Sequence, residues 1–412
     1  MQTQLTEIYR HHPLGKEAES ILRACVHCGF CTATCPTYQL LGDELDGPRG
    51  RIYQIKQILE GATPTASTRL HLDRCLTCRS CETTCPSGVR YGRLVDIGRE
   101  IVEHQTERPW TERLMRQALC RILPYPKRFQ TLLAIGYLVK PLLPLKLARK
   151  LPPQQKNQHW PAKPKPRKML AFEGCVQSVT TPATNIATAQ VLQKLGIALV
   201  PVKQAGCCGA VHLHLGETQA SLDFMRRNID AWWPQLEAGA EAIVVTASGC
   251  GATIKAYGEL LKNDPDYADK ARKIAALTKD ISEVLLTADF GKTLIDPEWR
   301  KIAFHSPCTL QHGQKLNGVV ETILAKAGFE LTTVADAHLC CGSAGTYSIL
   351  QPQLSQPLLQ NKLKNLEADE PAVIATANVG CQIHLASGTQ KQVLHWIELL
   401  DMALERPLRK TA

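Results

Sequence analysis

The sequence predicts an α+β protein of several domains, in which a small, mostly helical N-terminal domain is followed by two tandem α/β domains. Three observations lead to this prediction. The chain has 412 residues, more than a single simple core normally holds. A run of four cysteines occurs twice near the N-terminus, and a second, different cysteine pattern is repeated in the C-terminal half.

The N-terminal region, residues 1–105, is expected to be helical around its cysteine runs. Between the runs, the stretch "GPRGRIYQIKQILEGA" begins with Gly47 and Pro48, has isoleucines at helical spacing and stops at Gly61. The stretch "YGRLVDIGREIVEHQ", after the second run, has a similar periodicity. Each run is therefore expected to form a short loop in a helical domain.

Residues 106–167 read as a basic, proline-rich connector. No acidic residue occurs between Glu112 and Glu173, whereas residues 113–172 contain 14 Lys or Arg; since the net charge is +10, the rest of the chain sums to about −4. A solvated linker, an acidic partner subunit and contact with acidic lipid headgroups each explain this charge. Nucleic-acid binding is disfavoured, because proline and aliphatic residues dominate. No run of 18 apolar residues occurs, so no membrane span is expected.

The C-terminal half alternates short apolar runs with helical patterns, which predicts parallel strands linked by helices. It is also an internal repeat, since "FEGCVQ" aligns with "FHSPCTLQ" and "AGCCGAV" aligns with "HLCCGSA". Two domains of this kind are expected, at residues 168–290 and 291–412. Each copy carries a single cysteine, an adjacent pair and a last cysteine. These residues are Cys175, Cys207, Cys208 and Cys250 in the first copy, and Cys308, Cys340, Cys341 and Cys381 in the second.

The N-terminal runs have the spacing C-x2-C-x2-C-x3-C-P, which is typical of two-cluster iron–sulfur proteins. Three closely spaced thiolates hold one [4Fe–4S] cluster, and the fourth cysteine serves the other cluster. The first cluster is therefore assigned to Cys25, Cys28, Cys31 and Cys85, and the second to Cys75, Cys78, Cys81 and Cys35. Structural zinc fits less well, because zinc sites usually combine two separated pairs of ligands.

Three interpretations stay open for the eight cysteines of the repeats. They hold a further iron–sulfur centre or another metal, they form a thiol redox pair, or they are buried thiols of the core. Neighbouring glycines favour a cofactor, because they allow the backbone to approach it closely. Adjacent cysteines do not readily form a disulfide with each other.

Long phrases of this chain, among them "LLGDELDGPRGRIYQIKQILEG" and "HLCCGSAGTY", resemble the iron–sulfur subunits of bacterial glycolate oxidase. The C-terminal half is similar to the cysteine-rich domains of heterodisulfide reductase. The resemblance implies an electron-transfer subunit of a glycolate dehydrogenase complex, in which FAD-binding partner subunits oxidise glycolate to glyoxylate. Electrons would pass through this chain to a quinone or another acceptor. The implied location is the cytoplasm, at the cytoplasmic face of the inner membrane, with peripheral membrane contact.

Two further expectations qualify the resemblance. No G-x-G-x-x-G fingerprint follows a strand, so no FAD or NAD site is expected on this chain, and its catalytic residues are unknown. The reductase-like domains typically carry a fifth cysteine, where this chain has Ala247 and Asn378. An alternative function is a reductase that acts on a disulfide or quinone through the repeated cysteines.

Overall fold

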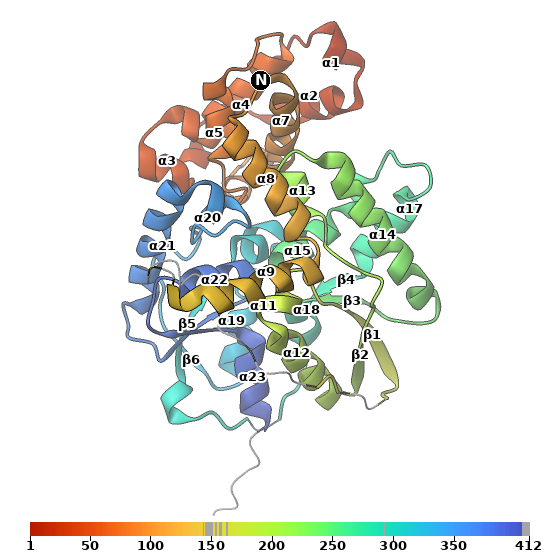
Figure 1. Ribbon diagram of the computed structural model, residues 1–412, viewed down its shortest axis with the longest axis vertical. Coiled ribbons are helices and arrows are strands. Elements are labelled where there is room, and N and C mark those ends of the chain that lie inside the picture. Colours follow the sequence, from red (N-terminus) through yellow and green to blue (C-terminus); the bar gives the residue numbers. More distant parts are fainter. Residues whose placement is uncertain are drawn as a thin grey trace, which may run out of the picture. The chain divides into compact units, whose positions relative to one another are not determined.

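The computed structural model describes residues 1–142, 144, 151–152, 155, 159–161, 164–291 and 293–405 (Figure 1). Several residues of the predicted connector, between positions 143 and 163, lie outside the described residues. The chain divides into two compact units. The first comprises Met1–Leu119, Val211–Thr218 and His338–Lys362, and the second comprises Cys120–Ala210, Gln219–Ala337 and Leu363–Ala412.

The N-terminal part of the first unit is helical, as the sequence predicts. Its helices are α1 (Glu7–His11), α2 (Pro13–Ala24), α3 (Pro36–Leu41), α4 (Pro48–Leu59), α5 (Ala66–Asp73), α6 (Ser80–Thr83), α7 (Tyr91–Gln105) and α8 (Trp110–Ile122). Helix α8 extends beyond Leu119, where the unit ends. The short helices α13 (Ala210–His214) and α20 (Tyr347–Leu350) and the start of α21 (Pro352–Glu367) come from the later segments.

Helices α4 and α7 form the centre of this unit (Figure 1). Pro48 opens α4, where a missing N–H costs nothing, and its isoleucines at helical spacing are buried. Gly98 of α7 allows a close approach, because a Cβ there would lie 2.7 Å from the side chain of Ile55. The expected helices in both stretches are confirmed. The first cysteine run lies between α2 and α3, and the second lies between α5 and α7.

The second unit contains two parallel four-stranded sheets with the same topology. The first has the order β2-β1-β3-β4, with β1 (Arg167–Phe172), β2 (Ile197–Pro201), β3 (Ile243–Val245) and β4 (Thr278–Asp280). The second has the order β6-β5-β7-β8, with β5 (Lys301–His305), β6 (Glu330–Leu331), β7 (Val373–Thr376) and β8 (Gln392–His395). Leu170 pairs with Ile243 in the first sheet, and Ile302 pairs with Val373 in the second.

Most of the remaining helices connect the strands of the two sheets; the first of them precedes β1 and the last follows β8. They are α9 (Pro126–Val139), α11 (Gln177–Thr180), α12 (Pro182–Lys194), α14 (Thr218–Glu237), α15 (Ser248–Lys255), α16 (Tyr257–Leu260), α17 (Ala268–Leu277), α18 (Ile281–Leu285), α19 (Val319–Lys326), α22 (Val379–Ala386) and α23 (Trp396–Glu405). A π-helical turn, Thr309–Gly313, follows β5. One hydrophobic core extends through both repeats and includes Val191 of α12 and Ile397 of α23. The predicted α/β repeat is thereby confirmed.

The strand predictions differ from the structure in detail. Each sheet has a fourth strand, β4 or β8, that the sequence did not indicate, because these strands are short and carry polar residues. The stretch "FELTTV" pairs only at Glu330–Leu331. No helix in the described part of the chain is both long and apolar enough to cross a membrane.

Candidate iron–sulfur centres

The two N-terminal cysteine runs fold into loops of the same shape. In each loop, the residues just before and just after the second cysteine have a left-handed backbone, namely His27 and Gly29 in the first loop and Thr77 and Arg79 in the second. Three of these four residues are not glycine, and such conformations persist only where the surroundings enforce them. The repeated strain indicates that each loop is shaped to direct its cysteines to one side.

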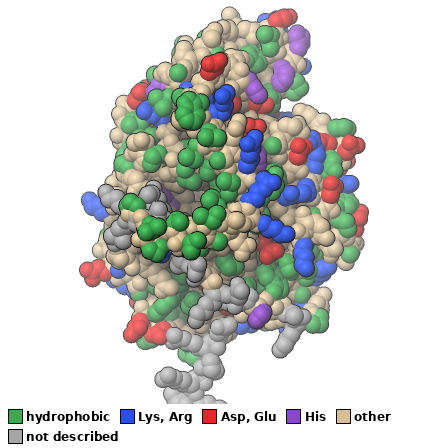
Figure 2. Space-filling model, viewed as in Figure 1, with side chains coloured by type: hydrophobic (Ala, Val, Ile, Leu, Met, Phe, Trp, Pro, Cys, Tyr) green, Lys and Arg blue, Asp and Glu red, His purple; other side chains and the backbone are tan. Residues whose placement is uncertain are grey.

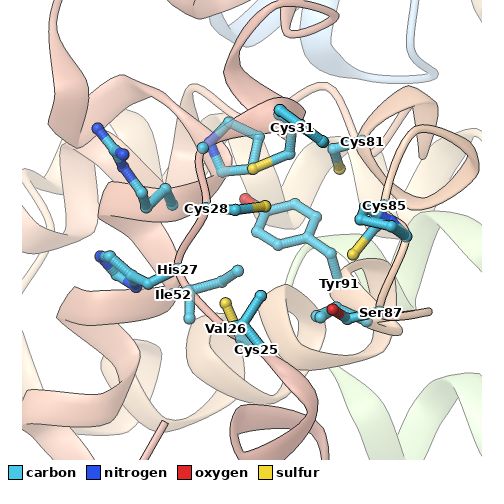
Figure 3. Close-up of a pocket in the computed structure, with 16 residues that line it drawn as sticks. Cys25, Val26, His27, Cys28, Cys31, Ile52, Cys81, Cys85, Ser87 and Tyr91 are labelled. Carbon is cyan, nitrogen blue, oxygen red and sulfur yellow. The ribbon is translucent and has the colours of Figure 1, made fainter.

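The first pocket is lined by Cys25, Cys28, Cys31 and Cys85, together with Cys81 and the side chains of neighbouring loops. Its empty volume is about 430 Å³, including the solvent at its mouth. Figure 3 shows the sulfur atoms of Cys25, Cys28, Cys31 and Cys85 facing a common space. Burial, and then the charge of Cys25, raises the pKa of the Cys31 thiol to about 11.

The second pocket is lined by Cys35, Cys75, Cys78 and Cys81, and its empty volume is about 300 Å³. Burial raises the pKa of Cys81 well above its ordinary value. Cys81 and Tyr91 line both pockets, so the two pockets are neighbours. The fourth cysteine of each run thus lies with the first three of the other run, which is the grouping that the crossed assignment requires.

The spacing of these thiols suits a cluster better than a single ion. A zinc ion with Zn–S distances of about 2.3 Å needs sulfur atoms within about 4.6 Å of one another. Among the described residues, no three of these eight thiols have sulfur atoms that all lie within 4.8 Å of each other. Two sets of four thiols around wider cavities therefore fit [4Fe–4S] clusters.

A buried ionic network lies beside the second pocket and was not foreseen from the sequence. Arg51 of α4 is fully buried and donates hydrogen bonds to Asp46, at 3.3 Å, and to the hydroxyl of Thr37, at 3.2 Å. Asp46 also bonds Arg74 at 2.8 Å and His71 at 3.1 Å. Burial lowers the pKa of Arg51, but nearby groups, with Tyr91 first, outweigh it and raise the pKa, so Arg51 is charged.

The four cysteines of the first repeat come together in the second unit. The sulfur atoms of Cys175 and Cys207 are 3.5 Å apart. Hydrogen bonds with Cys175 and Cys208, together with burial, raise the pKa of Cys207 well above its ordinary value. A hydrogen bond with Cys208, followed by burial, raises the pKa of Cys250 in the same way. Four thiols thus form one continuous cluster where β1, β2 and β3 end.

Two polar side chains hold the Cys207–Cys208 backbone in place. The amide of Asn228 donates to the Cys207 carbonyl at 2.8 Å, and the hydroxyl of Tyr257 donates to the Cys208 carbonyl at 2.9 Å. Both side chains are buried and are 3.1 Å from each other. The sequence offered no spacing that singles them out, since they come from α14 and α16.

The two CCG loops repeat the same local geometry. The Gly209 amide donates to the Cys207 sulfur at 3.5 Å, and the Gly342 amide donates to the Cys340 sulfur at 3.4 Å. Both glycines have a left-handed backbone, with φ near +90°. The hydroxyl of Ser221 in α14 donates to the Gly209 carbonyl at 3.0 Å, and that of Ser355 in α21 donates to the Gly342 carbonyl at 2.8 Å.

The cysteines of the second repeat are divided between the two units. Cys340 and Cys341 belong to the first, and Cys308 and Cys381 belong to the second. Asn378 stands where the resemblance leads one to expect a fifth cysteine. Its amide nitrogen donates to the Cys381 sulfur at 3.6 Å, and its oxygen accepts from the Gly249 amide of the first repeat at 3.3 Å. Asn378 thereby joins the two repeats.

Comparison with known proteins agrees with this organisation. Residues 21–89 match the 4Fe-4S dicluster domain family, and residues 169–255 and 302–386 match the cysteine-rich domain family. The chain is 56% identical to the glycolate oxidase iron–sulfur subunit of Escherichia coli (strain K12), over 98% of this chain and 100% of that protein. It is 32% identical to the probable glycolate oxidase iron–sulfur subunit of Bacillus subtilis (strain 168), over 96% of both chains.

A hypothetical protein from Helicobacter pylori has a similar fold, with a TM-score of 0.58 and 12% identity over 96% of this chain and 73% of that one. The predicted resemblance is confirmed by the two full-length relatives and by the order of the matched domains. The chain belongs to the family of glycolate oxidase iron–sulfur subunits.

Proposed function

We propose that this chain is the electron-transfer subunit of a complex that oxidises glycolate to glyoxylate. The observation that carries the proposal is the pair of neighbouring pockets, each lined by four thiols, in a chain similar to glycolate oxidase iron–sulfur subunits along its whole length. Bound [4Fe–4S] clusters supply one-electron transfer. The chain's own residues hold the clusters close together and limit the access of water.

Within this function, Cys25, Cys28, Cys31 and Cys85 hold one cluster, and Cys75, Cys78, Cys81 and Cys35 hold the other. The lining of the two pockets supports this assignment. The left-handed residues in each loop aim the thiols, and the buried helices behind them keep the two sites at a fixed separation. Such rigidity favours electron transfer, because little rearrangement accompanies each step.

The proposal includes an additional centre in the cysteine-rich repeats. The four converging thiols of the first repeat, Cys175, Cys207, Cys208 and Cys250, supply a soft ligand set that suits iron–sulfur chemistry. Their supports, Asn228 and Tyr257, hold the paired cysteines even without a bound group. For Cys308, Cys340, Cys341 and Cys381 the proposal rests on the repeat alone.

The electron donors are FAD-binding partner subunits, and the acceptor is a quinone or another carrier. A docking place for a partner lies at the mouth of the first pocket, where Cys28 is exposed and the side chains of Val26 and Phe30 are 69% and 62% exposed. Apolar side chains around a redox site are what a transient protein partner would cover.

The chain also contacts the cytoplasmic face of the inner membrane peripherally, through α9. Leu132, Ile135 and Leu138 are exposed on one face of this helix, and Leu142 follows in the next turn. Lys127, Arg128 and Lys140 flank them and are also exposed. Figure 2 shows hydrophobic side chains gathered on this face, with basic side chains beside them. An apolar stripe with basic flanks is typical of helices that bind anionic membrane surfaces.

The function is tested by reconstituting the purified chain anaerobically with iron and sulfide. About eight irons per chain and a dithionite-reduced EPR signal of two interacting clusters are the minimum expected. Adding the flavin subunits and glycolate should then reduce the clusters, whereas glycolate with this chain alone should leave them oxidised. Reduction by glycolate without any flavoprotein would contradict the assignment of this chain as a relay.

A further inference from the structure

We propose that Arg51 is the counter-charge that allows the cluster in the second pocket to accept an electron. This inference rests on the proposed function, because it assumes that Cys35, Cys75, Cys78 and Cys81 hold a cluster. It adds a role for a residue outside both cysteine runs. The role is to raise the reduction potential of one of the two sites.

The cysteines of the second pocket are more buried than those of the first. Cys35, Cys75 and Cys81 are buried there, whereas the first pocket has the exposed Cys28 and the partly exposed Cys31. Reduction adds one electron, supplied by the flavin of the partner subunits, to a centre that is already negative. Burial opposes this added charge, because a low-dielectric surrounding stabilises ions poorly. A buried centre therefore needs a compensating positive charge or hydrogen bonds to its sulfur ligands.

The residues around the second pocket provide a positive charge and a hydrogen bond to a sulfur ligand. The Tyr91 hydroxyl is 3.6 Å from the Cys75 sulfur and donates to it. The Thr37 hydroxyl lies 3.3 Å from the Cys35 sulfur and accepts a hydrogen bond from Arg51. The Thr37 hydroxyl donates its hydrogen to the Asp46 carbonyl at 2.8 Å, so Thr37 connects the Arg51 guanidinium to the immediate surroundings of the Cys35 sulfur.

Arg51 faces a cluster of charged groups. Its carboxylate partner Asp46 also bonds the guanidinium of Arg74 and the imidazole of His71. A carboxylate oxygen of Asp43 lies within 4.8 Å of Asp46 and His71 and offsets part of the positive charge. Arg51 is the fully buried guanidinium of this cluster, and it lines the second pocket. At the first pocket, by contrast, Arg49 pairs with Glu44 at 2.6 Å, and both side chains are partly exposed. That pair is neutral, and water screens it.

The test is an EPR-monitored redox titration of the reconstituted full chain. Cys78→Ser identifies which signal belongs to the second pocket, because it alters a ligand there alone. Arg51→Gln should then lower the midpoint potential of that signal and leave the other unchanged. At a fixed applied potential, we expect the ratio of reduced to oxidised cluster to fall at least tenfold. This corresponds to a decrease of about 59 mV in the midpoint potential of a one-electron couple. Arg51→Lys should restore most of the potential, and Arg49→Gln should not change it.

Two milder variants keep the test decisive if Arg51→Gln loses iron. Arg74→Gln removes one positive charge from a partly exposed position, and Tyr91→Phe removes the donor to Cys75. Each should lower the same midpoint by a smaller amount. Unchanged midpoints in both variants, with about eight irons still bound, would overturn the inference and leave the proposed function intact. A wild-type chain that binds no clusters would refute the proposed function instead.

Discussion

The hydroxyl of Tyr347 donates a hydrogen bond to the backbone carbonyl of Arg74 at 3.1 Å, within the first unit. Arg74 directly precedes Cys75 of the second cysteine loop, and Tyr347 follows the CCG loop of the second repeat. Burial, and then the charges of Cys75 and Cys340, raise the pKa of Tyr347, although Arg51 opposes them. The CCG loop of the second repeat therefore lies close to the second [4Fe–4S] pocket.

Tyr347→Phe should loosen this connection without emptying the pocket. Loss of one buried hydrogen bond costs about 1 kcal/mol, and the orphaned Arg74 carbonyl adds to that cost. The thermal unfolding midpoint should therefore fall by a few degrees, while the iron content stays unchanged. Tyr53→Phe is the matched control, because Tyr53 is exposed. An equal effect in both variants would contradict the importance of this contact.

The crossed ligand assignment predicts which variants resemble each other. Cys35→Ser should change the same EPR signal as Cys78→Ser, whereas Cys85→Ser should change the same signal as Cys28→Ser. A serine oxygen is a poorer ligand for iron than a thiolate, so each variant perturbs one cluster most. Without crossing, Cys35→Ser would instead resemble Cys28→Ser. Spectra of the four single variants, reconstituted side by side, distinguish the two arrangements.

The thiol cluster of the first repeat predicts iron beyond that of the two N-terminal clusters. Iron should exceed about eight per chain, and Cys208→Ser should remove the excess while both N-terminal EPR signals persist. Cys120→Ser serves as the control, since Cys120 is a buried cysteine outside both patterns. Wild-type iron of about eight, unchanged in Cys208→Ser, would leave these thiols without a metal role.

His395 predicts a dependence of stability on pH. It is fully buried as the last residue of β8, with Nε2 3.0 Å from the Thr246 carbonyl, and burial lowers its pKa to about 4. A depressed folded-state pKa gives stability that is present above the unfolded-state pKa of about 6.5 and is lost as pH falls toward 4. Over that window the loss is about 3 kcal/mol, from roughly 1.4 kcal/mol per pKa unit.

His395→Gln provides the measurement for this pH effect. Glutamine retains a donor for Thr246 but does not titrate, so the stability difference between wild type and variant should shrink as the pH falls from 7 to 4.5. Taking this difference cancels the opposing contributions of Asp280 and Glu398, whose pKa values burial raises to about 6. A constant difference in urea unfolding across this range would contradict the assignment.

The exposed stripe of α9 predicts binding to anionic vesicles. Replacing Ile135 and Leu138 with glutamate should reduce co-sedimentation with phosphatidylserine-containing vesicles at least tenfold, because it removes apolar contact and adds repulsive charge. Leu286→Glu, at another exposed apolar position, should have no effect. High salt should weaken wild-type binding as well, since exposed charges are screened. Vesicle binding that is the same in the α9 double variant and in wild type would rule out this surface.

The sequence by itself determined the features that depend on local spacing. The cysteine intervals, the proline that follows each run and the isoleucine periodicity of α4 are all written in contiguous residues. They were sufficient for the two N-terminal motifs, the helices around them and the α/β repeat with its four cysteines per copy. The full-length resemblance added the family.

Only the tertiary structure decided which distant groups meet. Arg51 and Tyr91 acquire a role at the second pocket because helix packing places them beside Cys35 and Cys75, and nothing in their spacing indicates it. The same holds for Asn228 and Tyr257 behind the CCG pair, for Asn378 between the repeats and for Tyr347 beside Arg74. Burial and charge at a site are sums over the whole fold. A local pattern can therefore identify the ligands of a cluster, but the residues that adjust its potential come from elsewhere in the chain.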